Sequence, residues 1–301
     1  MPEKIRLYLQ ALRLERWPRS LAILPGAIAV LALHRPLIPS FDILDTVLKL
    51  GLAFVLTWFV STANYIINEI TDAPFDAFHP LKKNRPLVNG EINRNLLLLL
   101  WLILAGISLL IAHLLFNVYF LLSLLGLLVA GLLYNVPPVR VKDIPLLDST
   151  IESANNPIRF LIGWYILKNT FPPLTLLVAW WVFGNFLMVG KRVAEKKFLT
   201  EEESAGYRRS LKRSSFGLLV AFMIFNALLF LVFFSLFAVV SQLHSFLYSL
   251  PLIVIYLAMF MKKSLQDREG AEEPEKLLKN PYFAGYTLFL AIIFVVAYIL
   301  G

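Results

Sequence analysis

The chain has 301 residues, is 58% hydrophobic and has a mean hydropathy of +0.72, a composition typical of an integral membrane protein. It contains no cysteine, which excludes disulfides, thiolate catalysis and zinc–thiolate sites. The net charge of +8 does not indicate nucleic-acid binding, because the basic residues lie beside apolar stretches, where membrane topology explains them. The first 20 residues are basic and amphipathic and show no signal-peptide cleavage pattern.

Nine apolar stretches come close to the length of about 20 residues that crosses a bilayer. They are residues 19–34, 46–69, 95–114, 117–135, 146–167, 173–193, 215–238, 245–261 and 281–300. We therefore expect an all-α, polytopic membrane protein with nine transmembrane helices and one transmembrane domain over residues 1–301. Basic residues gather in alternate connections, so the positive-inside rule predicts a cytoplasmic N-terminus, an outer C-terminus and cytoplasmic long loops.

The segment before the first stretch reads RLERWPRS, residues 13–20. Trp17 suits the headgroup level of a membrane, where it would anchor the chain while the arginines stay in the cytosol. The alternative is a binding role, in which Arg13 and Arg19 reach an anionic head group.

A four-residue polar series marks the end of the second stretch. Asn64, Asn68, Asp72 and Asp76 each follow the last by four positions, which stacks them on one face of a helix. Amide and carboxylate oxygens suit Mg²⁺, which is usually shared with substrate phosphates. The series predicts a Mg²⁺ site at Asn68, Asp72 and Asp76, on the cytoplasmic side. The alternative is a solvated helix end that carries a few acids.

Cationic residues follow this series. We expect Pro74 to interrupt the helix, because proline lacks a backbone donor and clashes with the preceding turn. Lys82, Lys83 and Arg85 come next, where they would bind the phosphates of a substrate.

The fourth stretch ends in YNVPPVRVKD, residues 134–143, where two prolines stop the helix. Arg140 and Lys142 follow on a short loop. A structural turn and a phosphate contact are both open for this loop.

The fifth stretch carries ionisable groups inside an apolar segment. Asp148, Glu152, Asn156 and Arg159 recur at intervals of three or four and share one face. Such groups are costly in a membrane, face the bundle interior and usually mark function. A purely structural network of these charges is the alternative. Pro157 is expected to weaken the helix and to leave backbone groups for a ligand.

The sixth stretch ends in a highly charged segment, residues 190–215. Lys191 and Arg192 close the stretch, and Glu195 lies four residues after Lys191. We expect a cation pair and one carboxylate at the mouth of a cavity, with more positive charge from Arg208. A solvated amphipathic helix is the alternative.

The series Asn68-Glu69-x-x-Asp72-x-x-x-Asp76 in a nine-span chain resembles the UbiA superfamily of intramembrane prenyltransferases. The pattern of that family is NDxxDxxxD on the second helix, so only Glu69 departs from it. The resemblance covers essentially the whole chain. It implies a Mg²⁺-dependent transferase in the cell membrane, with its active site facing the cytoplasm and Asp72 and Asp76 in the catalytic centre.

Typical members that use prenyl diphosphates carry a second DxxxD after the sixth helix, and this sequence has GKRVAE there, residues 190–195. That segment and HPLKKNRP, residues 79–86, resemble the branch typified by decaprenyl-phosphate phosphoribosyltransferase. The branch implies transfer of phosphoribose from phosphoribosyl pyrophosphate to a polyprenyl phosphate. The cations would bind phosphates, and Asp148, Glu152 or Glu195 would hold ribose hydroxyls or a second metal.

Two other functions stay open. The segment from Tyr134 to Asp148, YNVPPVRVKDIPLLD, looks more like branches that move a prenyl group from a prenyl diphosphate to an aromatic or lipid acceptor, and it makes Tyr134 a candidate substrate contact. A transporter or lipid-binding protein is the third hypothesis, although no inverted repeat is evident. The expected partners of the enzyme are a lipid acceptor and a phosphorylated cytosolic donor, without nucleic acid. A homo-oligomer is left open.

Overall fold

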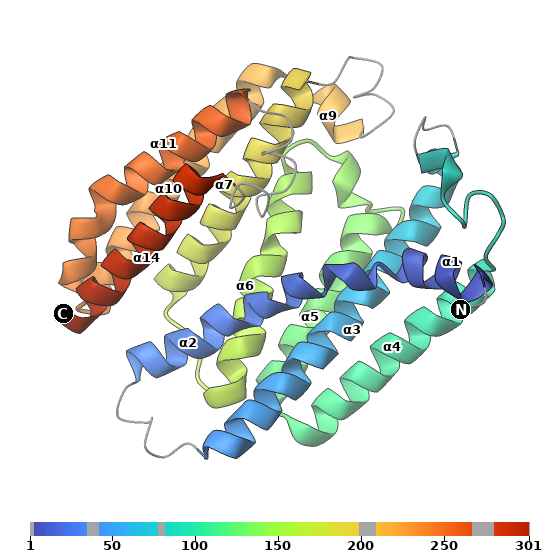
Figure 1. The fold of residues 1–301 in the computed structure, drawn as a ribbon, viewed down its shortest axis with the longest axis horizontal. Coiled ribbons are helices and arrows are strands. Elements are labelled where there is room, and N and C mark those ends of the chain that lie inside the picture. Colours follow the sequence, from blue (N-terminus) through green and yellow to red (C-terminus); the bar gives the residue numbers. More distant parts are fainter. Residues whose placement is uncertain (1–2, 35–41, 78–81, 199–208, 267–279, 301) are drawn as a thin grey trace. The chain divides into compact units, whose positions relative to one another are not determined.

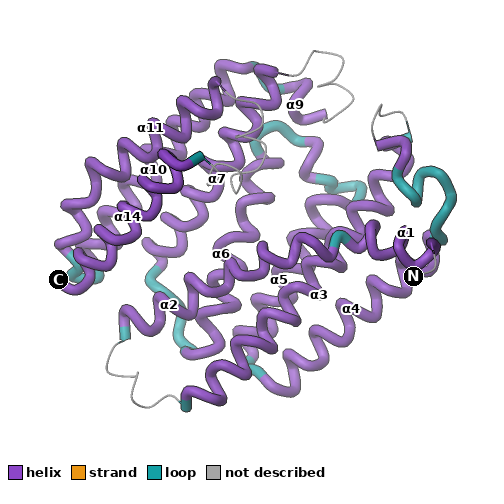
Figure 2. The backbone as a smooth tube through the Cα atoms, in the orientation of Figure 1, coloured by secondary structure: helices purple, strands orange, loops and turns teal. Residues whose placement is uncertain are grey.

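The computed structural model describes residues 3–34, 42–77, 82–198, 209–266 and 280–300. Every secondary-structure element in these ranges is a helix, and none of the described residues forms a strand (Figures 1 and 2). The chain divides into two compact units. Unit 1 comprises residues 1–141 and 155–172, and unit 2 comprises residues 142–154 and 173–301. The all-α prediction is confirmed.

Unit 1 is built around one long helix, α3. Its elements are α1 (Glu3–Leu12), η1 (Leu14–Ile23), α2 (Leu24–Leu33), α3 (Ile43–Asp76), η3 (Lys82–Asn84), α4 (Arg94–Leu115) and α5 (Val118–Asn135), followed by η4 (Val141–Asp143) and α6 (Leu147–Leu167), which both run across the unit boundary. Helix α3 packs against α1, η1, α4 and α5 (Figure 1). Apolar residues near its C-terminal half, such as Ile66 and Ile70, share a core with Ala11 and Leu97.

Helix α3 is longer than the apolar layer of a bilayer is thick. Its 34 residues rise about 51 Å, against about 30 Å for the hydrocarbon core of a bilayer. The expectation that Pro74 interrupts this helix was wrong, because α3 continues through Pro74 and ends at Asp76. A proline in the last turn removes one intrahelical donor only, and the backbone N–H of Ala77 still bonds to the carbonyl of Ala73. Asp76 therefore stays on the same helix as Asp72.

Close backbone approach joins α2 to α6 within unit 1. A Cβ atom added at Gly26 would overlap the main-chain oxygen of Phe160, and one at Gly163 would overlap the main-chain oxygen of Ile23. The two glycines thus allow the helices to touch at main-chain distance, the usual device for helix packing in membranes.

Asn64 serves packing in the same unit. Its side-chain amide donates to the carbonyl of Leu127 on α5 at 2.8 Å, and its side chain lies against Gly131, where a Cβ would collide with it. The first residue of the four-residue series is thus engaged with α5, and it contributes to the contact between α3 and α5.

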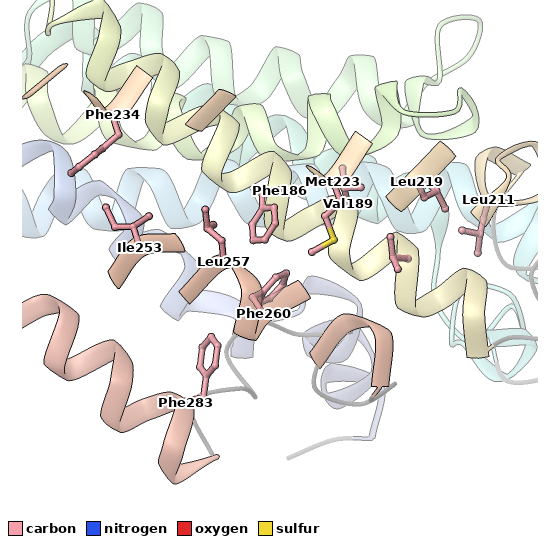
Figure 3. Packing of buried hydrophobic residues seen from close by; sticks show 11 residues of the cluster. Phe186, Val189, Leu211, Leu219, Met223, Phe234, Ile253, Leu257, Phe260 and Phe283 are labelled. Atoms are coloured by element: carbon pink, nitrogen blue, oxygen red, sulfur yellow. The ribbon is translucent and has the colours of Figure 1, made fainter. Parts of the chain in front are cut away.

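The described residues of unit 2 include four long helices. Its elements are α7 (Leu174–Phe198), α9 (Arg209–Arg213), α10 (Phe216–Val240), η5 (His244–Ser249), α11 (Leu250–Gln266) and α14 (Pro281–Leu300). Figure 3 shows side chains from these helices meeting in one apolar core, with Phe186 of α7, Met223 of α10 and Phe260 of α11 fully buried. Within this packing, Asn185 donates to Asn226 at 2.9 Å, so a buried amide pair links α7 to α10.

Seven helical segments among the described residues are long and apolar enough to cross a membrane. They are Ile43–Asp76, Arg94–Leu115, Val118–Asn135, Leu174–Phe198, Phe216–Val240, His244–Gln266 and Pro281–Ile299. The other two expected spans differ for physical reasons: α2 has only 10 residues after a 3-10 helix, and α6 has 21 residues but carries several charges. The chain is a multi-pass membrane protein, and the count of nine spans and the cytoplasmic N-terminus stay predictions.

Candidate functional site

The polar end of α3 is neutralised by arginines from other segments of unit 1. Asp72 accepts a hydrogen bond from Arg140 at 2.9 Å, and the same guanidinium donates to the carbonyl of Thr71 at 3.1 Å. The guanidinium also lies 4.3 Å from the ring centroid of Phe75, close enough for a cation–π contact. Arg140 is therefore held by α3 in three ways, although it comes from the loop after α5.

A second ion-pair group lies on the same helix end. Arg85 donates to Asp76 at 2.6 Å and lies 3.4 Å from Glu69, and Arg13 donates to Glu69 at 2.9 Å. Glu69 and Asp76 are almost fully buried, with 4% and 5% of their surface exposed. Buried carboxylates need such partners, because an unpaired buried charge is strongly destabilising.

The middle of the α3 face carries further polar groups. Ser61 and Tyr65 precede Asn68, and with Asp72 and Asp76 they recur at steps of three or four, so the five side chains share one face of α3. Arg159 of α6 donates to Ser61 at 3.2 Å, and Arg19 of η1 donates to the Tyr65 hydroxyl at 3.4 Å. Unit 1 therefore brings Arg19 and Arg159, two of the expected substrate contacts, to the face that carries the expected metal ligands.

In unit 2, one arginine is enclosed by carboxylates. The guanidinium of Arg192 donates through Nε to Asp148 at 2.7 Å, through one terminal nitrogen to Glu195 at 3.0 Å, and through the other to Glu152. Arg192 is 1% exposed, and Asp148 and Glu195 are each 2% exposed. The hydroxyl of Ser210 on α9 donates a hydrogen bond to Asp148 at 3.2 Å. The four charged groups sum to −2, because three carboxylates surround one guanidinium.

This geometry differs from the expected role of Arg192. The sequence predicted a direct phosphate contact at a cavity mouth, whereas three carboxylates occupy the guanidinium and bury it. A guanidinium offers five N–H donors in a fixed fork, and all three of its nitrogens already donate here. Asp148, Glu152 and Glu195, each expected as an alternative ligand for ribose hydroxyls or a second metal, lie together around Arg192 in unit 2. That role stays a prediction.

The remaining expected residues divide between the units. In unit 1, Asn68, Tyr134 and Asn156 are half-buried, Lys83 is exposed, and only the backbone of Lys82 is described. In unit 2, Lys142 is buried and Lys191 is half-buried. Arg208 lies outside the described residues. Their contacts with a substrate stay predictions.

The donor chemistry at the end of α3 fits Mg²⁺. Among the described residues no group of three His, Cys, Asp or Glu side chains is placed to hold a metal. Mg²⁺ does not need such a group, since one or two carboxylates with substrate phosphates and water usually suffice. Asp72, Asp76 and the amide of Asn68 on one helix face meet that requirement. An arginine on one oxygen does not exclude a cation, because a carboxylate has about four acceptor positions.

Two partners of the charged groups, one in each unit, were not singled out from the sequence. Glu69 was noted only as a departure from a family pattern, and Ser210 was not assigned any role. A signal for Glu69 was present, because a carboxylate in a membrane segment next to the polar series requires a cation. No local pattern pointed to Arg13 as that cation, since it lies 56 residues earlier in the chain.

The sequence and the fold both match known proteins. The profile of the UbiA prenyltransferase family matches residues 22–293. A UbiA homolog from Archaeoglobus fulgidus bound to GPP and Mg²⁺ superposes with a TM-score of 0.69 and 22% identity, covering 97% of this chain and 99% of that chain. A digeranylgeranylglyceryl phosphate synthase superposes with a TM-score of 0.64 and 21% identity, covering 99% and 98% of the two chains.

Curated relatives match more locally. A decaprenyl-phosphate phosphoribosyltransferase from Mycolicibacterium smegmatis is 27% identical over 206 residues, which are 68% of this chain and 61% of that protein. A protein of the same name from Mycobacterium tuberculosis is 26% identical over 205 residues, which are 67% of this chain and 64% of that protein. The chain thus spans less than two thirds of the length of these relatives.

Fold and sequence together define a polytopic, membrane-embedded transferase. The chain belongs to the UbiA prenyltransferase family, whose profile runs through both units. The family resemblance drawn from the polar series on α3 is confirmed.

Proposed function

We propose that this transferase moves phosphoribose from phosphoribosyl pyrophosphate to a polyprenyl phosphate. The observation that carries the proposal is the arginine-centred carboxylate group of unit 2, in which Arg192 contacts Asp148, Glu152 and Glu195. In typical relatives that use prenyl diphosphates, a second acidic motif stands in this sequence region. Here the three carboxylates of unit 2 instead surround a guanidinium that is part of the chain.

The same carboxylates suit a sugar. Their group carries a net charge of −2, so it favours hydroxyl donors over further anions. Ribose offers two hydroxyls beside its reacting carbon, and a prenyl chain offers none. Glu152 is the most accessible of the three acids, with 27% of its side chain exposed, and is the best placed to accept from a ribose hydroxyl. Arg192 is then a positioning residue, because it acts through the acids that it fixes.

The end of α3 would bind the leaving group. Asn68, Asp72 and Asp76 would hold Mg²⁺, which when bound neutralises negative charge on the pyrophosphate. Arg85 and Arg140, each within 3 Å of a carboxylate of this helix end, are available to exchange that carboxylate for a phosphate oxygen. The pyrophosphate of the donor would then be bound by Mg²⁺ and by these two arginines.

The transfer itself needs one bond exchange. The bond between C1 of ribose and pyrophosphate breaks with its electron pair leaving on pyrophosphate, and a phosphate oxygen of the lipid forms the new bond to C1. The acceptor is already an anion at neutral pH, so no side chain needs to remove a proton from it. The chain supplies orientation and charge, in a single domain of the cell membrane whose site faces the cytoplasm.

The names of the curated relatives support this substrate pair, although the chain spans less than two thirds of their length. The second candidate is transfer of a prenyl group from a prenyl diphosphate. It is favoured by the similar fold of the Archaeoglobus fulgidus homolog that was solved with GPP and Mg²⁺.

A donor competition separates the two. Purified protein in detergent with Mg²⁺ and a polyprenyl phosphate is offered either labelled phosphoribosyl pyrophosphate or a labelled prenyl diphosphate, the latter with lipid extract as a further source of acceptors. We expect label in the lipid phase from the ribose donor only. Label from the prenyl donor, without any from the ribose donor, would replace the proposal by the second candidate.

A further inference from the structure

The polar face of α3 changes character along its length. At its C-terminal end it carries the acids Asp72 and Asp76, and nearer the middle of the helix it carries the neutral groups Ser61 and Tyr65. Tyr65 precedes Asp72 by seven residues, which is about 10 Å along the axis, and Ser61 lies about 6 Å deeper. Between Lys49 and Ser61 only Thr57 is polar, so this deeper part of the face lies in the membrane segment.

Arginines from two other elements surround the deeper part. Arg159 of α6 donates to Ser61 at 3.2 Å. Arg19 donates to the Tyr65 hydroxyl at 3.4 Å, and the guanidinium of Arg16 lies 5.6 Å from the centroid of the Tyr65 ring. Two arginines of η1 thus contact Tyr65, and Arg159 contacts Ser61, which lies one helical turn away on the same face of α3.

Arg159 is the least satisfied member of this group. Its Nε atom is buried without a hydrogen-bond partner, and no ion pair joins Arg159 to any carboxylate of the described residues. A guanidinium in an apolar segment is costly, and it normally pairs with an anion or marks a functional site. Ser61 supplies a neutral oxygen only, which leaves the positive charge of Arg159 without compensation.

We propose that Arg159, Arg19, Tyr65 and Ser61 form a binding site for the phosphate of a lipid, with its hydrocarbon chain in the membrane. Two arginines in a medium of low polarity bind phosphate strongly, and the hydroxyls of Tyr65 and Ser61 can each donate to a phosphate oxygen. A lipid phosphate fits better than a soluble one because the site lies deeper in the membrane segment than the acids of α3. The inference rests on the proposed function in identifying this lipid as the acceptor.

The distance between this site and the acids of α3 suits a site for the acceptor. A nucleophile that displaces pyrophosphate from C1 approaches from the opposite side, so the two phosphates must be held apart with the sugar carbon between them. On α3 the cation-binding acids and the arginine group are about two turns apart, and both lie on the same helix face. One helix would therefore set the distance between the leaving group and the attacking lipid phosphate.

Binding without any donor tests the site directly. Purified protein in detergent is titrated with a polyprenyl phosphate, with the corresponding polyprenol and with inorganic phosphate, and the bound fraction is read by native mass spectrometry. We expect the lipid phosphate to bind at least about tenfold more tightly than the alcohol, the size of one charge-assisted contact. Inorganic phosphate that competes at similar concentration would show a site for free phosphate and would overturn the lipid assignment.

Variants assign the effect to the arginine group. Arg159→Gln should abolish the preference for the phosphate over the alcohol, and Arg159→Lys should retain part of it. Arg94→Gln, at the exposed start of α4, removes the same charge elsewhere and should bind like the wild type. If Arg159→Gln does not fold, the double variant Tyr65→Phe, Ser61→Ala removes two hydroxyls and should weaken the binding of the lipid phosphate severalfold.

Failure of this inference is distinct from failure of the proposed function. The site is refuted if Arg159→Gln binds the lipid phosphate as tightly as the wild type does. If only the double variant Tyr65→Phe, Ser61→Ala folds, wild-type affinity in that variant refutes the site. Neither result affects the proposal of ribose transfer. Transfer of a prenyl group in the donor competition would refute the proposed function while leaving the binding result unchanged.

Discussion

Replacing Arg192 by methionine tests how unit 2 holds its carboxylates. The substitution keeps an unbranched side chain of similar reach and removes the guanidinium that contacts Asp148, Glu152 and Glu195. The charge of the group changes from −2 to −3, and two of the three acids are 2% exposed. We therefore expect the main effect on the stability of the protein, and a loss of activity as its consequence.

The expected magnitude follows from burial. Removing one partner of a buried ion pair costs about 3–5 kcal/mol, because the remaining charge stays buried and unpaired. For a unit of this size such a loss corresponds to a fall in melting temperature on the order of 10 °C.

The assay has a matched control in the same unit. Arg209 lies 3.9 Å from Asp143 with 61% of its side chain exposed, and an exposed ion pair contributes about 0–1 kcal/mol. Both variants are heated in detergent, and the folded fraction is measured by fluorescence-detected size-exclusion chromatography. Arg209→Met should melt close to the wild type, and Arg192→Met well below it.

A rescue variant completes the test. Adding Asp148→Asn and Glu195→Gln to Arg192→Met removes two of the three stranded charges and should recover most of the lost stability. Wild-type melting of Arg192→Met, together with a selective increase in KM for phosphoribosyl pyrophosphate, would refute the positioning role. It would restore the sequence-based interpretation of Arg192 as a phosphate ligand.

Three further predictions concern the metal, the packing and the topology. Asp72→Asn should reduce turnover by at least about a hundredfold, as EDTA should in the wild type, because asparagine lacks the charge that would attract Mg²⁺. The melting temperature should change little, because asparagine keeps an oxygen that can accept from Arg140. Activity that persists in EDTA would remove the metal from the mechanism. Gly163→Ala should destabilise the protein by about 1–3 kcal/mol, because its Cβ would meet the backbone of Ile23. The control Gly106→Ala, with open space around the added Cβ, should leave the melting temperature unchanged. Equal melting temperatures for the two variants would contradict the close approach of α2 and α6. Reporter tags at Glu91 and after the last residue should report the cytoplasm and the outside respectively, and the same side for both would mean that the number of spans between Glu91 and the last residue is even.

The helices of this protein are encoded locally, so the sequence predicted them well. Runs of about 20 apolar residues leave few alternatives in a membrane, and the described segments at residues 94–115 and 216–240 follow them closely. The predicted break at Pro74 was wrong because a proline costs a helix one hydrogen bond and one clash, and the last turn of α3 tolerates both.

The partners in the site could not be predicted in the same way. Periodicity shows which residues share a face of one helix, and it grouped Asp72 with Asp76 correctly. It cannot show that Asn64, in the same series, contacts α5, or that the cation for Glu69 comes from Arg13. These contacts depend on which helices become neighbours, and that is decided by packing over the whole unit.

The ion pairs at the end of α3 have a consequence for how ligands enter. Three carboxylates and three arginines cancel each other's charge there: Glu69, Asp72, Asp76, Arg13, Arg85 and Arg140. A lone cation must compete with an arginine for its carboxylate, and a lone anion must compete with a carboxylate for its arginine. A metal and a phosphate that arrive together replace each internal pair by two external ones, so each ligand should increase the affinity for the other by the same factor. This neutral group of charges would then discriminate against Mg²⁺ alone and against phosphate alone, and select their complex.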